Sequence, residues 1–136
     1  ADIEGSPWPL GARRFDAVVI TNYLWRERLP EVMGSVAEGG VLIYETFSAG
    51  NETVGKPLNP KFLLRPGELL ESARGLRVVA FEDGFDPGGE NAPPRFVQRI
   101  VAVREGIAAA APARHFLQPE SGAPGQVKSA DSEDLP

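Results

Sequence analysis

Polar side chains follow two apolar runs of the sequence, close to where each run ends. Thr21–Tyr23 comes directly after Val18–Ile20, and Glu45 lies near the end of Val41–Phe47. Ligands in open α/β sheets bind beyond the carboxyl ends of the parallel strands, so both segments are predicted to lie on one ligand-facing edge. Glu45 is the one acid at such an end, and its carboxylate can act as a base or bind a substrate group. The alternative is a carboxylate that simply ends a strand in water.

The composition argues against several other kinds of chemistry. The 136 residues include no cysteine and a single histidine, His115, so thiolate sites and a histidine metal cluster are excluded, and we predict no metal site. The formal net charge is −5, and the basic residues are scattered, which argues against nucleic acid or an anionic membrane as a partner. No apolar run approaches the roughly 20 residues that span a bilayer. We therefore expect a cytoplasmic protein.

The first half of the sequence has the pattern of a strand, a helix and a second strand. Phe15–Thr21 contains apolar residues without polar alternation, which suits a strand covered on both faces. Apolar residues then recur at helical spacing from Leu29 to Val36, and Gly39 is predicted to lie just past the helix end. The second strand, Val41–Phe47, should run parallel to the first through a right-handed crossover.

The second half predicts a long loop, a short helix and two antiparallel strands. Ser48–Arg65 has no clear periodicity, and it is either a cap over a substrate or a tolerated surface insertion. A helix is predicted from Pro66 to Gly75, followed by a strand at Leu76–Glu82. The last strand, Phe96–Arg104, follows without an intervening helix, so it should pair antiparallel with the strand before it.

One domain is expected over residues 1 to 104. Residues 105 to 136 are rich in Ala, Pro, Gly and Ser, with few large apolar side chains, so we predict a disordered tail. Residues 1 to 13 read as loop, and the chain begins with Ala1 rather than Met. The first strand therefore lacks a preceding strand and helix to cover it, and we expect a C-terminal portion of a longer domain.

This order of elements resembles the end of class I S-adenosylmethionine-dependent methyltransferases. Phe15-Asp16 followed by Val18–Ile20 is similar to the family's fourth strand, and Glu38–Leu42 is similar to the turn into its fifth. Ala1–Glu4, followed by Pro7-Trp8-Pro9, is similar to the segment after its third strand. The small-molecule branch, ubiquinone-biosynthesis-like or tellurite-resistance-like, is the most similar.

The resemblance implies a fold, a cofactor and a set of contacts. The fold would be α/β, a partial Rossmann-like sheet of four strands in the family order 4-5-7-6 with the last strand antiparallel and the N-terminal glycine-rich half missing. The implied cofactor is S-adenosylmethionine, with Asp2 and Ile3 at its adenine ring. Thr21, Asn22 and Tyr23 would also contact the cofactor. Loop packing and helix capping are the alternative roles for Asn22 and Tyr23.

The implied function is methyl transfer to a small molecule, incomplete or inactive in this chain alone. Substrate contacts are expected from Glu45, Phe47, Asn51 and Phe62. Whether the chain is itself an enzyme stays open, because no Gly-x-Gly follows a strand anywhere in the sequence. The alternative function is a non-catalytic interaction module. Its open strand edge, Phe15–Thr21, would pair with an N-terminal half domain or with a second copy of the chain.

Overall fold

The computed structural model describes residues 10–106 and 114–117, and it contains one four-stranded sheet. The strands are β1 (Phe15–Thr21), β2 (Val36–Phe47), β3 (Arg77–Asp86) and β4 (Arg95–Val103). They lie in the order β1-β2-β4-β3, with β1 parallel to β2 and both other pairs antiparallel. The predicted strand order and direction are therefore confirmed.

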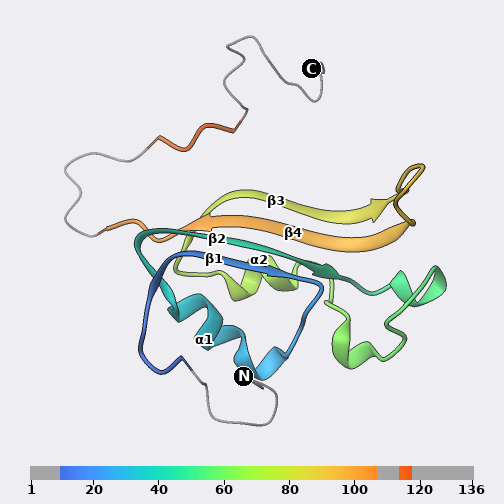
Figure 1. Cartoon of the computed structure of the whole chain (residues 1–136), viewed down its shortest axis with the longest axis horizontal. Coiled ribbons are helices and arrows are strands. Elements are labelled where there is room, and N and C mark those ends of the chain that lie inside the picture. Colours follow the sequence, from blue (N-terminus) through green and yellow to red (C-terminus); the bar gives the residue numbers. More distant parts are fainter. Residues whose placement is uncertain (1–9, 107–113, 118–136) are drawn as a thin grey trace.

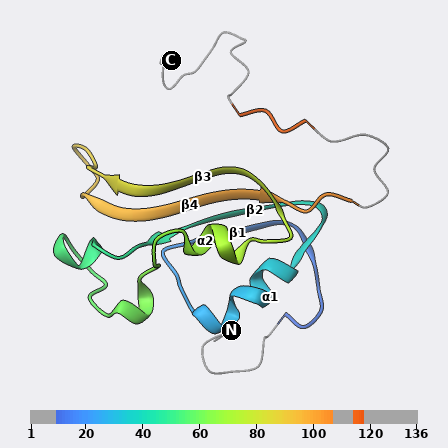
Figure 2. The same cartoon turned by 180° about the vertical axis from the view of Figure 1, so that it is seen from behind.

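The helices lie together on one side of this sheet (Figures 1 and 2). They are α1 (Leu29–Gly34) and α2 (Glu68–Ser72), with three short 3-10 turns, η1 (Arg26–Arg28), η2 (Asn51–Thr53) and η3 (Pro60–Phe62). The last two turns lie in the loop between β2 and α2, so that loop is more regular than expected. No helix in the described part of the chain is long and apolar enough to cross a membrane.

The first helix is shorter than its apolar spacing predicts, and the expectation that it runs to Gly39 is wrong. The Ser35 amide and hydroxyl both donate to the Val32 carbonyl, at 3.1 and 2.7 Å, and close the last turn. The Ser35 carbonyl then accepts the Phe15 amide at 2.7 Å, and Val36 pairs with Phe15 as the first residue of β2. Val36 is fully buried, so its apolar side chain belongs to the same core without being helical.

The third strand is longer than predicted. It continues four residues beyond Glu82, where Asp83, Gly84 and Phe85 pair with β4 and the strand closes at the Asp86–Arg95 pair. The sequence break therefore falls at Pro87–Pro94 rather than at Asp83. Phe85 and Phe96 face each other across this extension, with ring centroids 4.9 Å apart, and such aromatic cross-strand pairs stabilise a sheet.

The core lies between the sheet and the helices. Its buried members come from β2, β4, both helices and the adjoining loops: Leu24, Leu29, Val32, Met33, Val36, Leu42, Tyr44, Leu64, Leu69, Ala73 and Ile100. Val18 and Ile20 of β1 pack against this core. Alternate residues of each strand point to the other face, which no described helix covers (Figure 1).

The uncovered face carries apolar side chains where a solvated face would carry polar ones. Val19, Ile43 and Val101 lie side by side across β1, β2 and β4. Val19 is 63% exposed and Ile43 is 42% exposed. Within residues 10–106 and 114–117, β1 is thus covered on one face only, whereas the sequence predicts cover on both faces. We use the term open face for this side of the sheet.

Candidate functional site

The carboxyl ends of β1 and β2 meet at one edge, as the sequence predicts. Thr21 is the register partner of Glu45, and the Asn22 amide donates to the Glu45 carbonyl at 2.8 Å. Asn22 has a φ of 57°, a left-handed conformation that asparagine tolerates better than most residues. This turn ends β1 and leaves the Asn22 side chain exposed beyond the sheet.

A buried tyrosine fixes the segment that follows. The Tyr44 hydroxyl, on the helix side of β2, donates to the Tyr23 carbonyl at 2.7 Å. Burial raises the pKa of the Tyr44 phenol, so the hydroxyl keeps its proton and remains a donor at physiological pH. Tyr23 is partly buried and the next residue, Leu24, enters the core. The segment after β1 is therefore held in place by a side chain of β2.

Glu45 lies in an ionic network on the open face. Its Oε2 accepts from Arg99 Nε at 3.0 Å and lies 3.1 Å from Arg95 Nη2. Arg99 also donates to Asp86 Oδ2 at 2.6 Å and to Glu82 Oε1 at 3.0 Å. Both guanidinium groups contact the same carboxylate oxygen of Glu45, so this side chain is held in place by β4.

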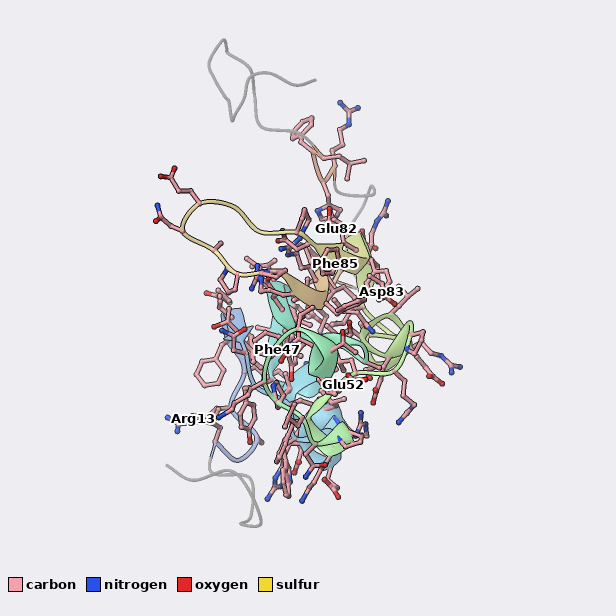
Figure 3. The ribbon with its side chains drawn as sticks, turned by 90° about the vertical axis from the view of Figure 1, so that its right-hand side faces the viewer. Arg13, Phe47, Glu52, Glu82, Asp83 and Phe85 are labelled. Carbon is pink, nitrogen blue, oxygen red and sulfur yellow. The ribbon has the colours of Figure 1, made fainter. Side chains whose placement is uncertain are left out.

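Asp86 and Arg99 strengthen each other within this network. The backbone amide of Gly88 and then the Arg99 guanidinium hydrogen-bond the Asp86 carboxylate, and they lower its pKa. The Asp86 hydrogen bond is also the main reason why the pKa of Arg99 is raised. The sequence does not predict the roles of Arg95 and Arg99, because their position opposite Glu45 depends on the register of β4. Figure 3 views this end of the molecule, with Glu82, Asp83 and Phe85 on β3.

The remaining predicted substrate contacts lie on the open face and in the loop after β2. Phe47 is partly buried and pairs with Val97 on the open face, beside the ionic network. Asn51 is buried, donating from Nδ2 to the Lys56 carbonyl and accepting the Phe96 amide at Oδ1, both at 2.8 Å. Its amide thus closes the loop onto β4. Phe62 lies in η3, 5.8 Å from the Lys61 ammonium.

Two predicted site residues and most of the predicted tail fall outside the described residues. Asp2 and Ile3 belong to the segment before residue 10, so nothing places them against the edge. His115 lies among residues 114–117, with Nε2 3.5 Å from Glu105 Oε2. Most of the predicted tail, residues 107–113 and 118–136, is also outside the described residues. Within the described ranges, no group of three acidic or histidine side chains has the arrangement of a metal site.

A buried ion pair lies below the edge, on the helix side. Arg26 donates from Nε and Nη2 to the two oxygens of Glu68, at 2.5 and 3.0 Å. The same guanidinium donates to the Leu63 carbonyl at 2.8 Å, and so connects η1 to the loop after β2. Burial would raise the pKa of Glu68, but the hydrogen bonds from Arg26 and from the Arg65 amide outweigh burial and lower it.

Comparison with known proteins supports the fold. No family model and no curated protein matches the sequence. The crystal structure of TehB from Haemophilus influenzae matches with a TM-score of 0.51 and 19% identity, over 69% of this chain and 36% of the TehB chain. A structure titled for the conversion of a disulfide bond into a thioacetal group during echinomycin biosynthesis has a TM-score of 0.49 and 12% identity, over 73% and 52% of the two chains.

The chain therefore spans about a third of the length of the TehB chain that it matches. At this level of identity the likeness concerns the fold. The mixed sheet, its strand order and its antiparallel last strand agree with what the sequence implies. The chain has an α/β fold, a partial Rossmann-like sheet that is similar to part of the TehB structure.

Proposed function

We propose that this chain forms the C-terminal part of a small-molecule methyltransferase domain of the ubiquinone-biosynthesis-like or tellurite-resistance-like branch. The observation that carries this proposal is the strand order β1-β2-β4-β3 with an antiparallel last strand, and the structural likeness to TehB supports it. The proposed role of the chain is to supply one wall of an S-adenosylmethionine site. The glycine-rich turn that would hold most of the cofactor is not found after any strand of this sequence.

The geometry of the edge fits this role. Thr21 ends β1, and Asn22 and Tyr23 follow it at the carboxyl end of the parallel pair, where ligands of such sheets bind. Asn22 offers an exposed amide that can hydrogen-bond the amino acid part of the cofactor, and Asp2 and Ile3 are proposed at its adenine. Phe47 and Glu45 lie on the adjoining open face, and Asn51 and Phe62 lie in the loop after β2. All four are proposed to contact the substrate.

Methyl transfer does not require acid–base or nucleophilic catalysis from these residues. The cofactor supplies a methyl group on a sulfonium centre, a good leaving group for in-line displacement. Positioning and exclusion of water can then account for most of the acceleration, and no catalytic triad is needed. In this proposal the chain's own part is to orient the two reactants at the edge. The Tyr44 hydroxyl and the Asn22 amide hold that edge rigid through their hydrogen bonds.

Calorimetry of S-adenosylmethionine binding tests the proposal. We expect no measurable binding by the isolated chain, because the main cofactor clamp is missing. Binding should appear when the chain is joined behind an N-terminal methyltransferase half that carries a glycine-rich turn. The control is the same joined protein with those glycines replaced by valine, which should not bind. Tight binding by the isolated chain would sink the idea that the clamp lies outside it.

A second candidate function, a non-catalytic interaction module, is supported by the open edge of β1. This edge strand has no pairing partner on its outer side within the described residues, and Val19 is its most exposed large apolar side chain. An unprotected apolar edge is a template for pairing with another strand. The proposed partner of an interaction module is a second copy of the chain. If the chain is part of a methyltransferase, the proposed partner is an N-terminal half domain.

A lysine on this edge should abolish self-association. We expect light scattering of the isolated chain to give a mass above the 14.6 kDa of one copy, and Val19→Lys to reduce it to that value. Lysine on an edge strand opposes strand pairing by charge. Val54→Lys is the matched control, since Val54 is 40% exposed in the loop after β2. A monomeric wild-type chain, or equal effects of the two variants, would rule out pairing through β1.

A further inference from the structure

The loop between β2 and α2 encloses a hollow that the site described above does not use. Its lining is contributed by η1 and by the loop from Ala49 to Arg65: Arg26, Ala49, Glu52, Leu58, Pro60, Lys61, Leu63 and Arg65. Its volume is about 450 Å³, within the range of about 300 to 1,000 Å³ typical of small-molecule sites. We name it the loop hollow. Figure 3 looks at this end of the molecule and labels Glu52 in the loop and Phe47 at the end of β2.

The lining of the loop hollow is partly apolar. Leu63 is buried at its base, whereas Leu58 is 64% exposed and Pro60 is also exposed. An exposed leucine beside a proline at the rim of a concave surface leaves apolar area that a ligand can cover. Figure 1 shows this segment extending beyond the end of β2, at the edge where β1 and β2 also end. The loop hollow therefore lies at the ligand end of the sheet.

Positive charge predominates around the loop hollow, although the whole chain has a net charge of −5. Its lining holds the cations Arg26, Lys61 and Arg65 and one carboxylate, Glu52. Arg26 is neutralised by Glu68, to which Arg65 also lies within 3.5 Å. Lys61 makes no ion pair within the described part of the chain.

Two of these charges are oriented by their neighbours. The Lys61 ammonium lies 4.4 Å from the centre of the Trp25 ring, which is a cation–π contact. Glu52 Oε1 accepts a hydrogen bond from the Gly50 amide at 2.8 Å, so this carboxylate is partly engaged within its own turn. The Arg65 side chain is 65% exposed, so its guanidinium remains accessible from solvent beside its contact with Glu68. Lys61 and Arg65 are thus the cations available to an incoming anion.

A neighbouring hollow between α1 and α2 lacks this combination. It shares Arg26 and Arg65, and Arg104 also lines it. The Arg104 guanidinium is committed to the carbonyls of Val36 and Met33, at 2.7 and 2.8 Å. Glu68 and Glu71 add negative charge there. Arg74 also lines this hollow and makes no ion pair within the described residues, but the apolar side chains Leu29 and Met33 are buried there. Of these two hollows, the loop hollow is the one that combines an unpaired cation with an exposed leucine.

We propose that the loop hollow binds a small amphipathic organic anion, with its acidic group at Lys61 and Arg65 and its apolar body against Leu58 and Pro60. This inference rests on the proposed function, because it assigns such acids as the substrate class of the methyltransferase. A carboxylate beside two cations forms charge-assisted hydrogen bonds, which are stronger than those between neutral groups. The loop from Ser48 to Arg65 then serves as a substrate-binding loop.

Fluorescence titration of the isolated chain with phenylacetate tests this site. Trp8→Phe leaves Trp25 as the only tryptophan, and the ring lies against Lys61, so its emission reports on the loop hollow. We expect a saturable change with a Kd of about 1 mM, typical of a small and weakly held ligand. Phenylacetamide, which has the same shape without the charge, should bind at least about fivefold more weakly.

A pair of lysine variants separates a specific site from general attraction by positive charge. In the Trp8→Phe background, Lys61→Met should weaken phenylacetate binding by about fivefold, near the upper range for one exposed ion pair. Lys56→Met removes a lysine of the same loop that does not line the loop hollow, and it should leave the Kd unchanged. Amide NMR shifts at Leu58, Lys61 and Leu63 should accompany binding of phenylacetate in both the parent chain and the Lys56→Met variant.

Three outcomes would overturn the inference. They are no saturation up to about 20 mM phenylacetate, equal binding of phenylacetamide, or equal effects of the two lysine substitutions. The titration contains no S-adenosylmethionine. Its failure is therefore distinct from failure of the cofactor test, which uses the joined protein and no organic acid.

Discussion

Replacing Arg26 by methionine is expected to lower the free energy of unfolding by about 2 kcal/mol at pH 7. The substitution leaves the Glu68 carboxylate, whose side chain is 4% exposed, without its bidentate partner. Removing one member of a fully buried ion pair costs roughly 3 to 5 kcal/mol. The expected loss is smaller because Arg26 is itself 30% exposed and the Arg65 amide still donates to Glu68. Urea denaturation measures the change.

The same substitution has a defined dependence on pH. The pKa of Glu68 is lowered in the folded chain, so its ionised form contributes stability above the unfolded value of about 4.5, and this is lost as pH falls through the lower folded pKa. Without Arg26, burial raises that pKa, and protonation relieves the penalty. The difference in free energy of unfolding between Arg26→Met and the parent chain should therefore become smaller as the pH falls from 7 to 4.

Arg65→Met is the matched control for this experiment. Arg65 lies 3.5 Å from the same carboxylate, but its side chain is 65% exposed, and exposed pairs contribute about 0.2 to 1 kcal/mol. Because the Arg65 amide survives the substitution, the loss should stay under about 1 kcal/mol. Equal losses for the two variants, or a loss for Arg26→Met that does not change with pH, would contradict the assigned role of the buried pair.

Alanine at Gly40 is expected to destabilise the chain by about 2 kcal/mol, within the range for overpacking a buried position. A Cβ at this residue would lie 2.9 Å from the carbonyl oxygens of Ala37 and Phe15 and 3.0 Å from that of Asp16. All three contacts are backbone atoms, so relief requires movement of β1 against β2. Such movement would also displace Thr21 from Glu45, because both strands carry the candidate site at their far ends.

Gly34→Ala provides the comparison for Gly40. A Cβ at Gly34 meets nothing within 4 Å, and the residue closes α1 without a positive φ. Alanine there should be neutral or stabilise the helix by up to about 1 kcal/mol. Thermal unfolding followed by circular dichroism measures both variants. An unchanged melting temperature for Gly40→Ala would contradict the close approach of the two strands.

The sequence predicts the order of strands because the signals for it are local. Phe15–Thr21 is apolar and is bounded by turn residues, and its predicted limits coincide with β1. The absence of a helical pattern between Leu76 and Phe96 predicts an antiparallel pair, which β3 and β4 form. Val36 was misassigned because a buried residue at helical spacing looks the same whether it ends a helix or begins a strand.

The charged contacts of the site could not be predicted in the same way. The pairing of Glu45 with Arg99 spans 54 residues and depends on the register of β4 against β2. Asn51 was predicted as a substrate contact, but its partner, the Phe96 amide, is 45 residues away and no local pattern indicates it. The Arg26–Glu68 pair likewise forms only when α1 and α2 share one face of the sheet.

Amide NMR of the joined protein, titrated with S-adenosylmethionine, tests most directly whether the edge of β1 and β2 forms a cofactor site. We expect the largest shifts within this chain at Thr21, Asn22 and Tyr23, with smaller ones at Glu45. Lys56 and Val54, in the loop, should not move. Saturable binding with shifts confined to the added N-terminal half would contradict the account, because this chain would then contribute nothing to the site.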